Sequence, residues 1–417
     1  MISTDEGRCP SARAETSAEA VKAACMSPAP PSASPASSTA SSPTKSRGAH
    51  AKEPSREPWR FDLALVSTYR APIYGFCIFW IVFFHAYAMV GVDYSFGNSS
   101  LAWLALVMEH GNVGVDVFLF LSGISLYFSW QRDPNLRNYY VKRLVRLFVP
   151  VIVIDGLYWF IRCIVLGQLD GVSGFIRRIT LTSMWTGGSQ STWYVELLLP
   201  LYLIYPLIHE FVYADDSAPK TALRAAVLIG VSYLVIYSFW SDEPELFDVV
   251  EIAVSRIPVF LLGCALGRTV YRHKKLPAWC AVLPFAGACL FFYVLSLGVL
   301  ERPFFRFFYL VGGVSLAYAF ALVFLGVDKL VQKASLYKKS LLLRGLSQLG
   351  GASLELYLAH ITLIQIYQLS PWYTEGAFVE YLPVAALAIV VALVASKLIV
   401  APLSKRLIAA ATTPKKA

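Results

Sequence analysis

The sequence predicts an all-α fold, a polytopic membrane bundle of about ten transmembrane helices. Of its 417 residues, 57% are apolar and only 15% are charged, and the mean hydropathy is +0.56. A soluble chain of this length would need far more charge to cover its surface. Apolar stretches of about 20 residues, long enough to cross a bilayer, recur along the chain. They lie near 71–90, 112–130, 149–166, 193–213, 223–240, 252–270, 278–298, 305–326, 350–369 and 381–402.

The composition divides the chain into three segments. Residues 1–57 are rich in Ser, Ala and Pro and bury too little apolar surface to fold, so we expect a disordered cytoplasmic tail. This tail has no apolar core of the signal-peptide kind, so we expect the first span to act as the export signal. Residues 58–405 form the membrane domain, and residues 406–417 form a short basic cytoplasmic C-terminus.

The distribution of Lys and Arg predicts the orientation in the membrane. Basic residues cluster after the even-numbered spans, whereas loop 91–100 has none and loop 241–250 is acidic. Because cytoplasmic loops collect Lys and Arg, both termini are expected in the cytoplasm, in a multi-pass protein of the cytoplasmic membrane. The net charge of +9 is then a topology signal, and the bilayer rather than a nucleic acid is the expected partner. Four arginines depart from the pattern: Arg177, Arg178, Arg302 and Arg306.

The first span carries polar groups at two depths. Arg70 and His85 stand fifteen residues apart, which on a helix is about 60° of rotation and about 22 Å of height. Tyr74 shares this stripe, within about 20° of His85. An ionisable residue at bilayer depth is costly unless it faces the protein interior, so His85 is a functional candidate. The alternative is a histidine bonded within the bundle and an arginine that anchors the span.

The second span begins with Glu109, His110 and Asp116 near its outer mouth, at the expected depth of His85. Asp116 beside a histidine would form the carboxylate–imidazole pair that supports general-base chemistry. The alternative for Asp116 is a helix-start carboxylate favoured by the helix dipole. The glycines of this span permit close approach of neighbouring helices.

Further along the chain, Lys142, Arg143 and Arg146 form a basic helix face at the cytoplasmic surface. It is either part of the positive-inside pattern or a site for a phosphate-bearing ligand from the cytosol.

Three later spans add polar groups of their own. Glu196 lies about one turn inside the outer boundary of the fourth span, where Trp193 is most simply an interfacial anchor. Arg256 opens the sixth span and is a plausible counter-ion for one of the carboxylates. Tyr357 and His360, at positions i and i+3 of the ninth span, share a helix face.

Several common kinds of site are absent from the sequence. No P-loop, nucleophile elbow, Rossmann glycine fingerprint or HExxH is present. The seven cysteines are scattered and form neither a CxxC nor a Cys/His cluster, so no disulfide framework and no metal site is predicted.

Six segments, in order, resemble the integral-membrane acyltransferase family 3. They are "YGFCIFWIVFFH", "GNVGVDVFLFLSG", "YYVKRLVRLFVP", "WYVELLLPLYLIYP", "SRIPVFLLGCALG" and "GGASLELYLAHITLI". The resemblance runs from about residue 61 to 402 and implies that 58–405 is a membrane acyltransferase domain. It also implies transfer of an acyl group, usually acetyl, from cytosolic acyl-CoA to a hydroxyl of a surface or secreted carbohydrate.

The resemblance assigns individual residues. His85 matches the histidine that ends the family's arginine–ten–histidine motif, but Tyr74 stands where the arginine is expected, and Arg70 one turn earlier is its expected substitute. Asp116, Arg143 and Arg146 match the family's second span and the basic pair after it, Tyr357 and His360 match its Tyr-Leu-x-His element, and Glu196 lies two positions from the usual glutamate.

We therefore expect a membrane O-acyltransferase, with acetyl-CoA as the expected donor and no metal. His85, Asp116 and Glu196 are the predicted catalytic residues. Arg70, Tyr74, Arg143 and Arg146 would bind acyl-CoA. Glu109, His110, Trp193, Arg256, Tyr357 and His360 would meet a polysaccharide or glycan acceptor. Machinery of polysaccharide assembly is a further expected partner.

Other classes of protein remain open. A proton-coupled transporter or a flippase would also place histidines and carboxylates at midplane depth, but such proteins tend to show internal repeats, and none is found here. A membrane glycosyltransferase would need larger outer loops, and a scaffold gives no reason for so many intramembrane ionisable groups.

Overall fold

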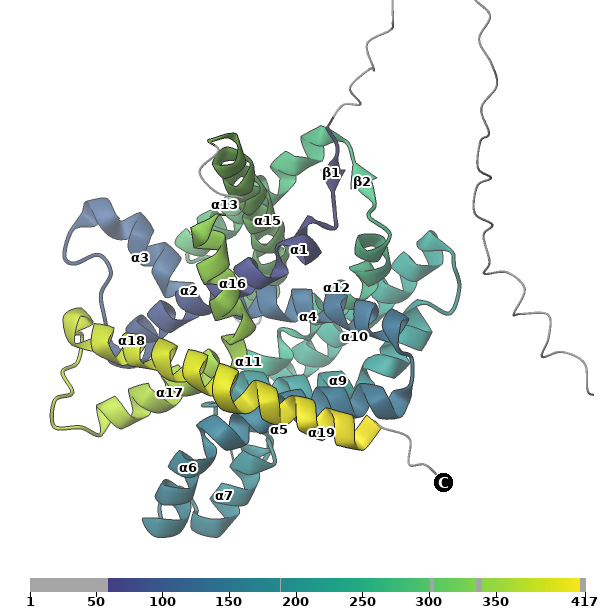
Figure 1. The fold of residues 1–417 in the computed structure, drawn as a ribbon. Coiled ribbons are helices and arrows are strands. Elements are labelled where there is room, and N and C mark those ends of the chain that lie inside the picture. Colours follow the sequence, from purple (N-terminus) through teal and green to yellow (C-terminus); the bar gives the residue numbers. More distant parts are fainter. Residues whose placement is uncertain (1–58, 188, 301–303, 335–339, 413–417) are drawn as a thin grey trace, which may run out of the picture. The chain divides into compact units, whose positions relative to one another are not determined.

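Long apolar helices make up the part of the chain that the structure describes (Figure 1). The structure is a computed structural model and describes residues 59–187, 189–300, 304–334 and 340–412. The predicted tail 1–57 and the last residues of the predicted basic C-terminus, 413–417, lie outside the described residues. The described residues belong to a single packing unit.

Within the described residues, eight helical segments are long and apolar enough to cross a membrane, and two bent helix pairs raise the number to ten. The all-α prediction is confirmed. The eight segments are Arg70–Val90, Ser99–Arg132, Trp193–Val212, Ala218–Asp242, Glu245–Tyr271, Ala278–Ser296, Phe304–Lys333 and Phe378–Thr412. The bent pairs are Leu136–Ile154 with Gly156–Val165, at 55°, and Leu341–Gly351 with Ser353–Gln368, at 71°.

Most of the predicted site residues lie in or directly before α2 (Arg70–Val90), α4 (Val113–Arg132), α5 (Leu136–Ile154), α9 (Trp193–Val212), α12 (Ile257–Tyr271) and α17 (Ser353–Gln368). The other long helices are α10 (Ala218–Asp242), α11 (Pro244–Val254), α13 (Leu283–Ser296), α15 (Tyr309–Lys333), α16 (Leu341–Gly351), α18 (Phe378–Ala395) and α19 (Ala401–Thr412). Short helices are α1 (Leu65–Thr68), α3 (Ala102–Glu109), α6 (Gly156–Trp159), α7 (Gly171–Ile179), α8 (Ser183–Gly187) and α14 (Phe304–Phe307). The 3₁₀ turns η1 (Ser99–Leu101) and η3 (Ala278–Val282) and the π-helices η2 (Phe160–Val165) and η4 (Ser396–Val400) complete the helical elements.

Glycines set how closely the central helices approach. A Cβ at Gly75 of α2 would lie 1.8 Å from the Leu346 carbonyl oxygen of α16, and one at Gly123 would lie 2.5 Å from the Phe260 carbonyl oxygen of α12. Backbones this close leave no room for a side chain, as in small-residue interfaces between membrane helices. The expectation of close packing at Gly123 is thus met, with α12 as the partner of α4.

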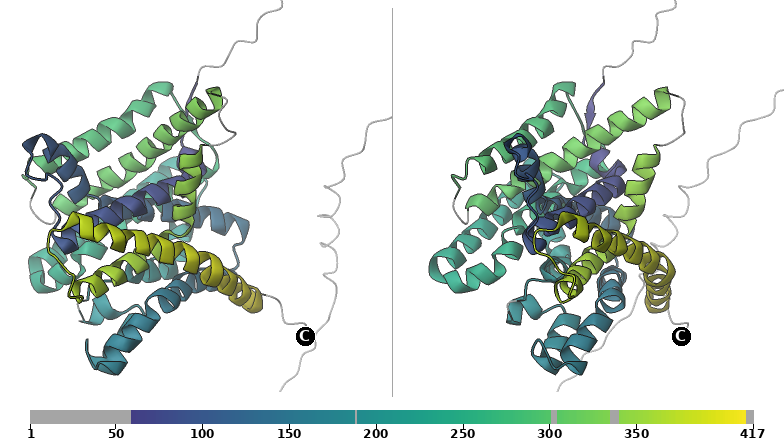
Figure 2. Two further views of the ribbon diagram at one scale, coloured as in Figure 1. Left: turned by 60° about the vertical axis from the view of Figure 1, so that its left-hand side comes forward. Right: turned by 90° about the vertical axis from the view of Figure 1, so that its left-hand side faces the viewer.

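Two parts of the chain differ in detail from the sequence prediction. The last span continues from α18 through η4 into α19, so the helix passes through the predicted boundary at residue 405 (Figure 2). The only strands among the described residues, β1 (Phe61–Asp62) and β2 (Lys275–Leu276), pair antiparallel with Phe61 opposite Leu276. This short ladder ties the chain before α2 to the connection after α12.

Bending in the third span separates α6 and η2 from α5, and α7 packs beside η2 (Figure 1). The segment between α5 and α9 is therefore folded, and it encloses part of the space beside α17.

Candidate functional site

Two histidines from helices far apart in sequence meet inside the bundle. His85 Nδ1 of α2 lies 3.1 Å from His360 Nε2 of α17, and the ring centroids are 4.9 Å apart. His360 is 1% exposed, whereas His85 is only half-buried. The sequence selected both residues but assigned them separate roles, and only the tertiary structure makes them a pair.

The hydrogen bonds determine where the protons of this pair lie. His360 Nδ1 lies 2.8 Å from the Leu356 carbonyl oxygen, and since a carbonyl only accepts, this nitrogen carries the proton. In a neutral imidazole, His360 Nε2 then bears the lone pair and accepts from His85 Nδ1–H, which also lies 2.9 Å from the Ile81 carbonyl oxygen. The assignment follows from the hydrogen-bond network. His85 Nε2 is left with a free lone pair and has no protein partner within the described residues.

The helix around His85 is held in place by two further hydroxyl groups. Tyr381 Oη donates to the Val82 carbonyl oxygen at 2.6 Å, and Tyr94 Oη donates to the Phe83 carbonyl oxygen at 2.6 Å. Such support restricts the orientation of the imidazole beside them, as a preorganised reacting group requires.

At the other end of α2, three arginines form what we call the basic cluster: Arg70, Arg143 and Arg146. Arg70 Nη1 donates to Ser125 Oγ at 2.7 Å, and the Arg143 guanidinium lies 5.8 Å from the Tyr202 ring centroid. Arg146 is within electrostatic range of both other arginines. No ion pair joins any of the three to a carboxylate among the described residues.

Lys142, beside the basic cluster, is different because it is already paired. Its ammonium group donates to the Asp133 carboxylate. This hydrogen bond holds the pKa of Asp133 below its usual range. Of the predicted basic face, Arg143 and Arg146 are therefore the cations left for an anionic ligand.

Aromatic side chains connect the basic cluster to the histidine pair. Tyr74 Oη lies 3.4 Å from Ser122 Oγ, and the Tyr74 ring contacts Phe118. Phe118 contacts Tyr194, Tyr194 contacts Tyr357 at 5.3 Å, and Tyr357 contacts His360 at 5.7 Å. The structure thus brings Arg70, Tyr74, Arg143 and Arg146 together at one end of this row, and His85, Tyr357 and His360 together at the other.

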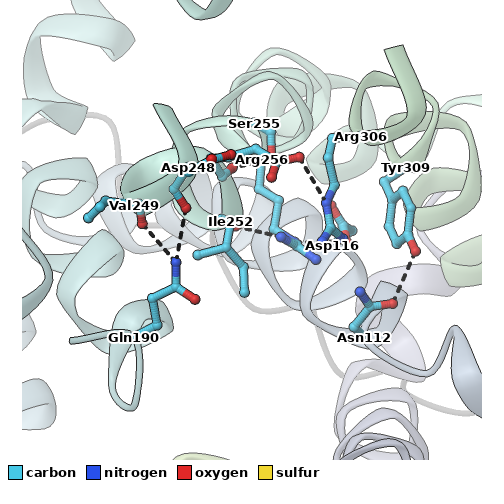
Figure 3. Close-up of polar contacts among 11 residues, drawn as sticks. Asn112, Asp116, Gln190, Asp248, Val249, Ile252, Ser255, Arg256, Arg306 and Tyr309 are labelled. Carbon is cyan, nitrogen blue, oxygen red and sulfur yellow. Dashed lines mark hydrogen bonds and ion pairs between the residues drawn. The ribbon is translucent and has the colours of Figure 1, made fainter. Parts of the chain in front are cut away.

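Asp116 belongs to a separate group, which we call the ionic layer: Asp116, Arg256, Glu251 and Arg306. Figure 3 shows Asp116, Arg256 and Arg306 of this group. Asp116 Oδ2 accepts from Arg256 Nε at 3.2 Å, with both side chains 1% exposed. Arg306 Nε lies 3.3 Å from Glu251 Oε1. The expectation that Asp116 orients an imidazole is not what the structure shows, because a buried carboxylate takes the nearest buried cation. The expectation that Arg256 pairs with a carboxylate agrees with the contact.

Trp193 and Tyr309 pack against the Arg256 guanidinium of the ionic layer. Arg256 Cζ lies 4.8 Å from the Trp193 ring centroid and 5.7 Å from that of Tyr309, and Tyr309 Oη donates to Asn112 Oδ1 at 3.2 Å. Trp193 is 6% exposed, so it packs on a buried cation rather than lying in an interfacial belt.

Glu196 is fully buried and fully bonded. It is 0% exposed and accepts from Ser183 Oγ at 2.6 Å, from Thr192 Oγ1 at 2.7 Å and from the Met184 amide at 2.7 Å. These bonds anchor the segment before α9 to its first turn. Glu196, a predicted catalytic residue, therefore meets only protein donors within the described residues.

Glu109 and His110 make no contact with the histidine pair within the described residues. His110 Nδ1 bonds to the Leu106 carbonyl oxygen at 2.8 Å, and its ring lies 6.4 Å from Phe305. Both residues stand just before α4.

One buried carboxylate that the sequence did not single out, Asp155, lies at the bend between α5 and α6. It is 1% exposed and accepts from Thr362 Oγ1 at 2.7 Å, two residues after His360. The signal was present, since Asp155 is an ionisable residue within the predicted third span.

Similarity to known proteins indicates the family to which the chain belongs. Residues 75–397 match the family model Acyl_transf_3, described as "Acyltransferase domain". The chain is also similar to "Regulator of hypoxia-inducible factor 1" of Caenorhabditis elegans, with 24% identity over 218 residues, and this alignment covers 41% of the chain and 42% of that protein. No solved structure matches. The family match spans most of the chain and both members of the histidine pair, so the chain belongs to acyltransferase family 3.

Proposed function

We propose that the protein transfers an acyl group, most simply acetyl, from cytosolic acyl-CoA to a hydroxyl of an exported or cell-surface polysaccharide. The observation that carries the proposal is the proton arrangement of the histidine pair. His360, by accepting from His85 Nδ1–H, leaves His85 Nε2 with a free lone pair. An oriented imidazole with a free lone pair is the usual general base for activating a hydroxyl.

The chemistry then needs few protein groups. His85 Nε2 takes the proton of the acceptor hydroxyl while its oxygen attacks the thioester carbonyl carbon. The C–S bond breaks, CoA leaves as a thiolate, and the proton on His85 returns to that sulfur. The products are an ester and CoA–SH. A variant of this route, in which the acyl group rests transiently on His85 before the hydroxyl attacks, uses the same nitrogen.

The basic cluster supplies the binding site for the donor. Acyl-CoA carries phosphates at one end and the thioester at the other, joined by a long flexible arm. Arg143 and Arg146, without carboxylate partners among the described residues, fit the phosphates, since guanidinium groups bind them bidentately. Arg70 lies on the same helix as His85, about 22 Å away along its axis. The row of aromatic side chains between Arg70 and His85 is where the flexible arm of acyl-CoA would lie.

The location of the protein is part of the proposal. Positive-inside bias supports a cytoplasmic membrane location with both termini in the cytoplasm, so that the basic cluster faces the donor pool and His85 lies toward the outer side. Proteins that assemble or export the polysaccharide are the expected partners.

Membrane vesicles test the proposal. Vesicles containing the wild-type protein are given radiolabelled acetyl-CoA and the surface glycans of the host cell. We expect CoA–SH release that matches the appearance of alkali-labile acetyl esters on the glycan, and loss of one acetyl mass increment from the glycans of cells lacking the gene.

The same experiment separates the main alternative. A transporter or flippase would move a substrate across the vesicle membrane without releasing CoA–SH. Substrate flux without thiol release from any of acetyl-, propionyl- or butyryl-CoA would overturn the acyltransfer proposal.

A further inference from the structure

A cavity of about 240 Å³ lies where η2, α7 and the last turns of α17 meet. None of the predicted catalytic, donor-binding or acceptor-binding residues is among its described lining. Its walls include Tyr158, Trp159, Arg162, Arg178, Gln365 and Gln368. Sites for drug-sized ligands measure about 300–1,000 Å³, so this cavity fits a single group of monosaccharide size.

Two buried polar atoms of the cavity wall have no partner among the described residues: Arg178 Nε and Gln365 Oε1. Arg178 is 8% exposed, and its Nη1 donates to the Gly174 carbonyl oxygen at 3.1 Å. A buried polar group left without a partner costs about 1–3 kcal/mol. Both residues line the cavity, so its wall carries a guanidinium donor and a side-chain amide, the groups that bind hydroxyls.

The charge of the cavity is positive. Arg162 donates to Gln168 Oε1 and to Tyr158 Oη, and the Arg178 guanidinium lies 4.8 Å from the Trp159 ring centroid. No Asp or Glu belongs to the described lining. The nearby carboxylate of Asp155 lies outside the cavity wall and accepts from Thr362. Two guanidinium groups held by neutral partners favour an anionic ligand.

The cavity lies next to the histidine pair. Gln368 Nε2 donates to the Met89 carbonyl oxygen at 2.7 Å, and Met89 stands one helical turn beyond His85 on α2. Gln365 and Gln368 follow His360 on α17 by about 7.5 and 12 Å of helix rise. Along α17, the cavity therefore lies within a little over two helical turns of the histidine pair.

We propose that this cavity holds the acceptor, as a monosaccharide-sized polyhydroxylated group that bears one carboxylate or phosphate. Arg162 and Arg178 bind the anionic group, and Gln365 and Gln368 bind hydroxyls. The assignment rests on the proposed function and deepens it, because it names the chemical class of the acceptor.

Binding titrations with the purified full chain in detergent test the site. Four probes are compared at equal ionic strength: glucuronate, glucose 1-phosphate, glucose and inorganic phosphate. We expect glucuronate or glucose 1-phosphate to bind at least about tenfold more tightly than glucose and than inorganic phosphate. Which of the two binds more tightly separates a uronic acid from a phosphate-linked sugar. Equal affinity for glucose, or for inorganic phosphate, overturns the proposal.

Variants place the binding in this cavity. Gln365→Glu adds a carboxylate beside Arg178 and should raise the Kd of the preferred probe at least about tenfold, through like-charge repulsion. Arg162→Gln should also raise the Kd of the preferred probe. This variant leaves the contacts that Arg178 makes within α7 unchanged. The matched control is Arg177→Gln, since Arg177 neighbours Arg178, pairs with Asp170 at 2.7 Å and does not line the cavity. An unchanged Kd in both Gln365→Glu and Arg162→Gln overturns the site.

The result also separates this proposal from the proposed function. His85→Ala should bind the probe with unchanged Kd while losing acyl transfer. Probe binding that is sensitive to Gln365→Glu, in a wild-type protein that releases no CoA–SH, would retain the cavity as an anionic-sugar site and refute acyl transfer.

Discussion

The ionic layer and the histidine pair are both polar groups inside an apolar bundle, yet they are built differently. In the ionic layer, Asp116 meets Arg256 and Glu251 meets Arg306. In the histidine pair, one hydrogen bond joins the two imidazole rings, and His85 Nε2 has no protein partner within the described residues. The basic cluster resembles the histidine pair in having groups available to a ligand, because its arginines lack carboxylate partners within the described residues.

The difference shows which intramembrane polar groups to read as functional. A buried charge is costly, and pairing it with an opposite charge relieves that cost. Groups that the fold has already paired, such as Asp116 and Glu196, therefore hold helices together. Groups left with an open donor, acceptor or charge are the ones able to act on a ligand.

The largest expected effect on activity comes from removing His85, whose Nε2 carries the free lone pair. His85→Ala should lower acyl transfer by about 10²–10⁴-fold, because that is the usual contribution of a general base. Radiolabel transfer in membrane vesicles measures it, and protein level and melting temperature should stay near wild type. The control His273→Ala removes an exposed histidine that lies 3.3 Å from Asp62 and should keep full activity. Wild-type activity in His85→Ala would remove this residue from the mechanism.

The ionic layer predicts a large effect on stability instead. Asp116→Ala leaves Arg256 buried and unpaired, so we expect a loss of about 3–5 kcal/mol in the free energy of unfolding. Denaturant titration of the purified protein checks this value. The double variant Asp116→Leu with Arg256→Met should recover most of the loss, since apolar residues can replace a buried pair. A double variant as unstable as the single one would show that the charges do more than satisfy each other.

A smaller effect is expected at the basic cluster. Arg146→Gln should raise the KM for acetyl-CoA about tenfold, the equivalent of about 1.4 kcal/mol, with little change in kcat. Such a change means that binding, and not the chemical step, was lost. Initial rates over a range of acetyl-CoA concentrations provide the measurement, and a fall in kcat at unchanged KM would count against a donor site here.

The smallest effect is expected at Lys142, which serves as the matched control for Arg146. Its charge is already compensated by Asp133, and surface pairs contribute about 0–1 kcal/mol. Lys142→Gln should therefore leave the KM for acetyl-CoA within about twofold of wild type. An increase as large as that of Arg146→Gln would mean that positive charge in general, and no particular arginine, attracts the donor.

Most of the fold was open to prediction from the sequence. The span count and the positions of the spans agree with the helices, because a membrane helix must be apolar along about 20 residues, and that is a local property. The bends after Ile154 and after Gly351 were not predicted, since hydropathy is the same in a straight and a broken span.

The sequence by itself determined that this is a helical membrane protein and at which depth in the bilayer its polar side chains lie. It also identified His85, His360 and the three arginines of the basic cluster as candidate site residues. Their partners were decided by the tertiary structure. His85 contacts His360 from 275 positions away, and Asp116 contacts Arg256 from 140 positions away. Helical periodicity gives the depth and face of a residue but not which face of another helix it meets. The cavity beside α17 likewise exists only because α7 folds back against it.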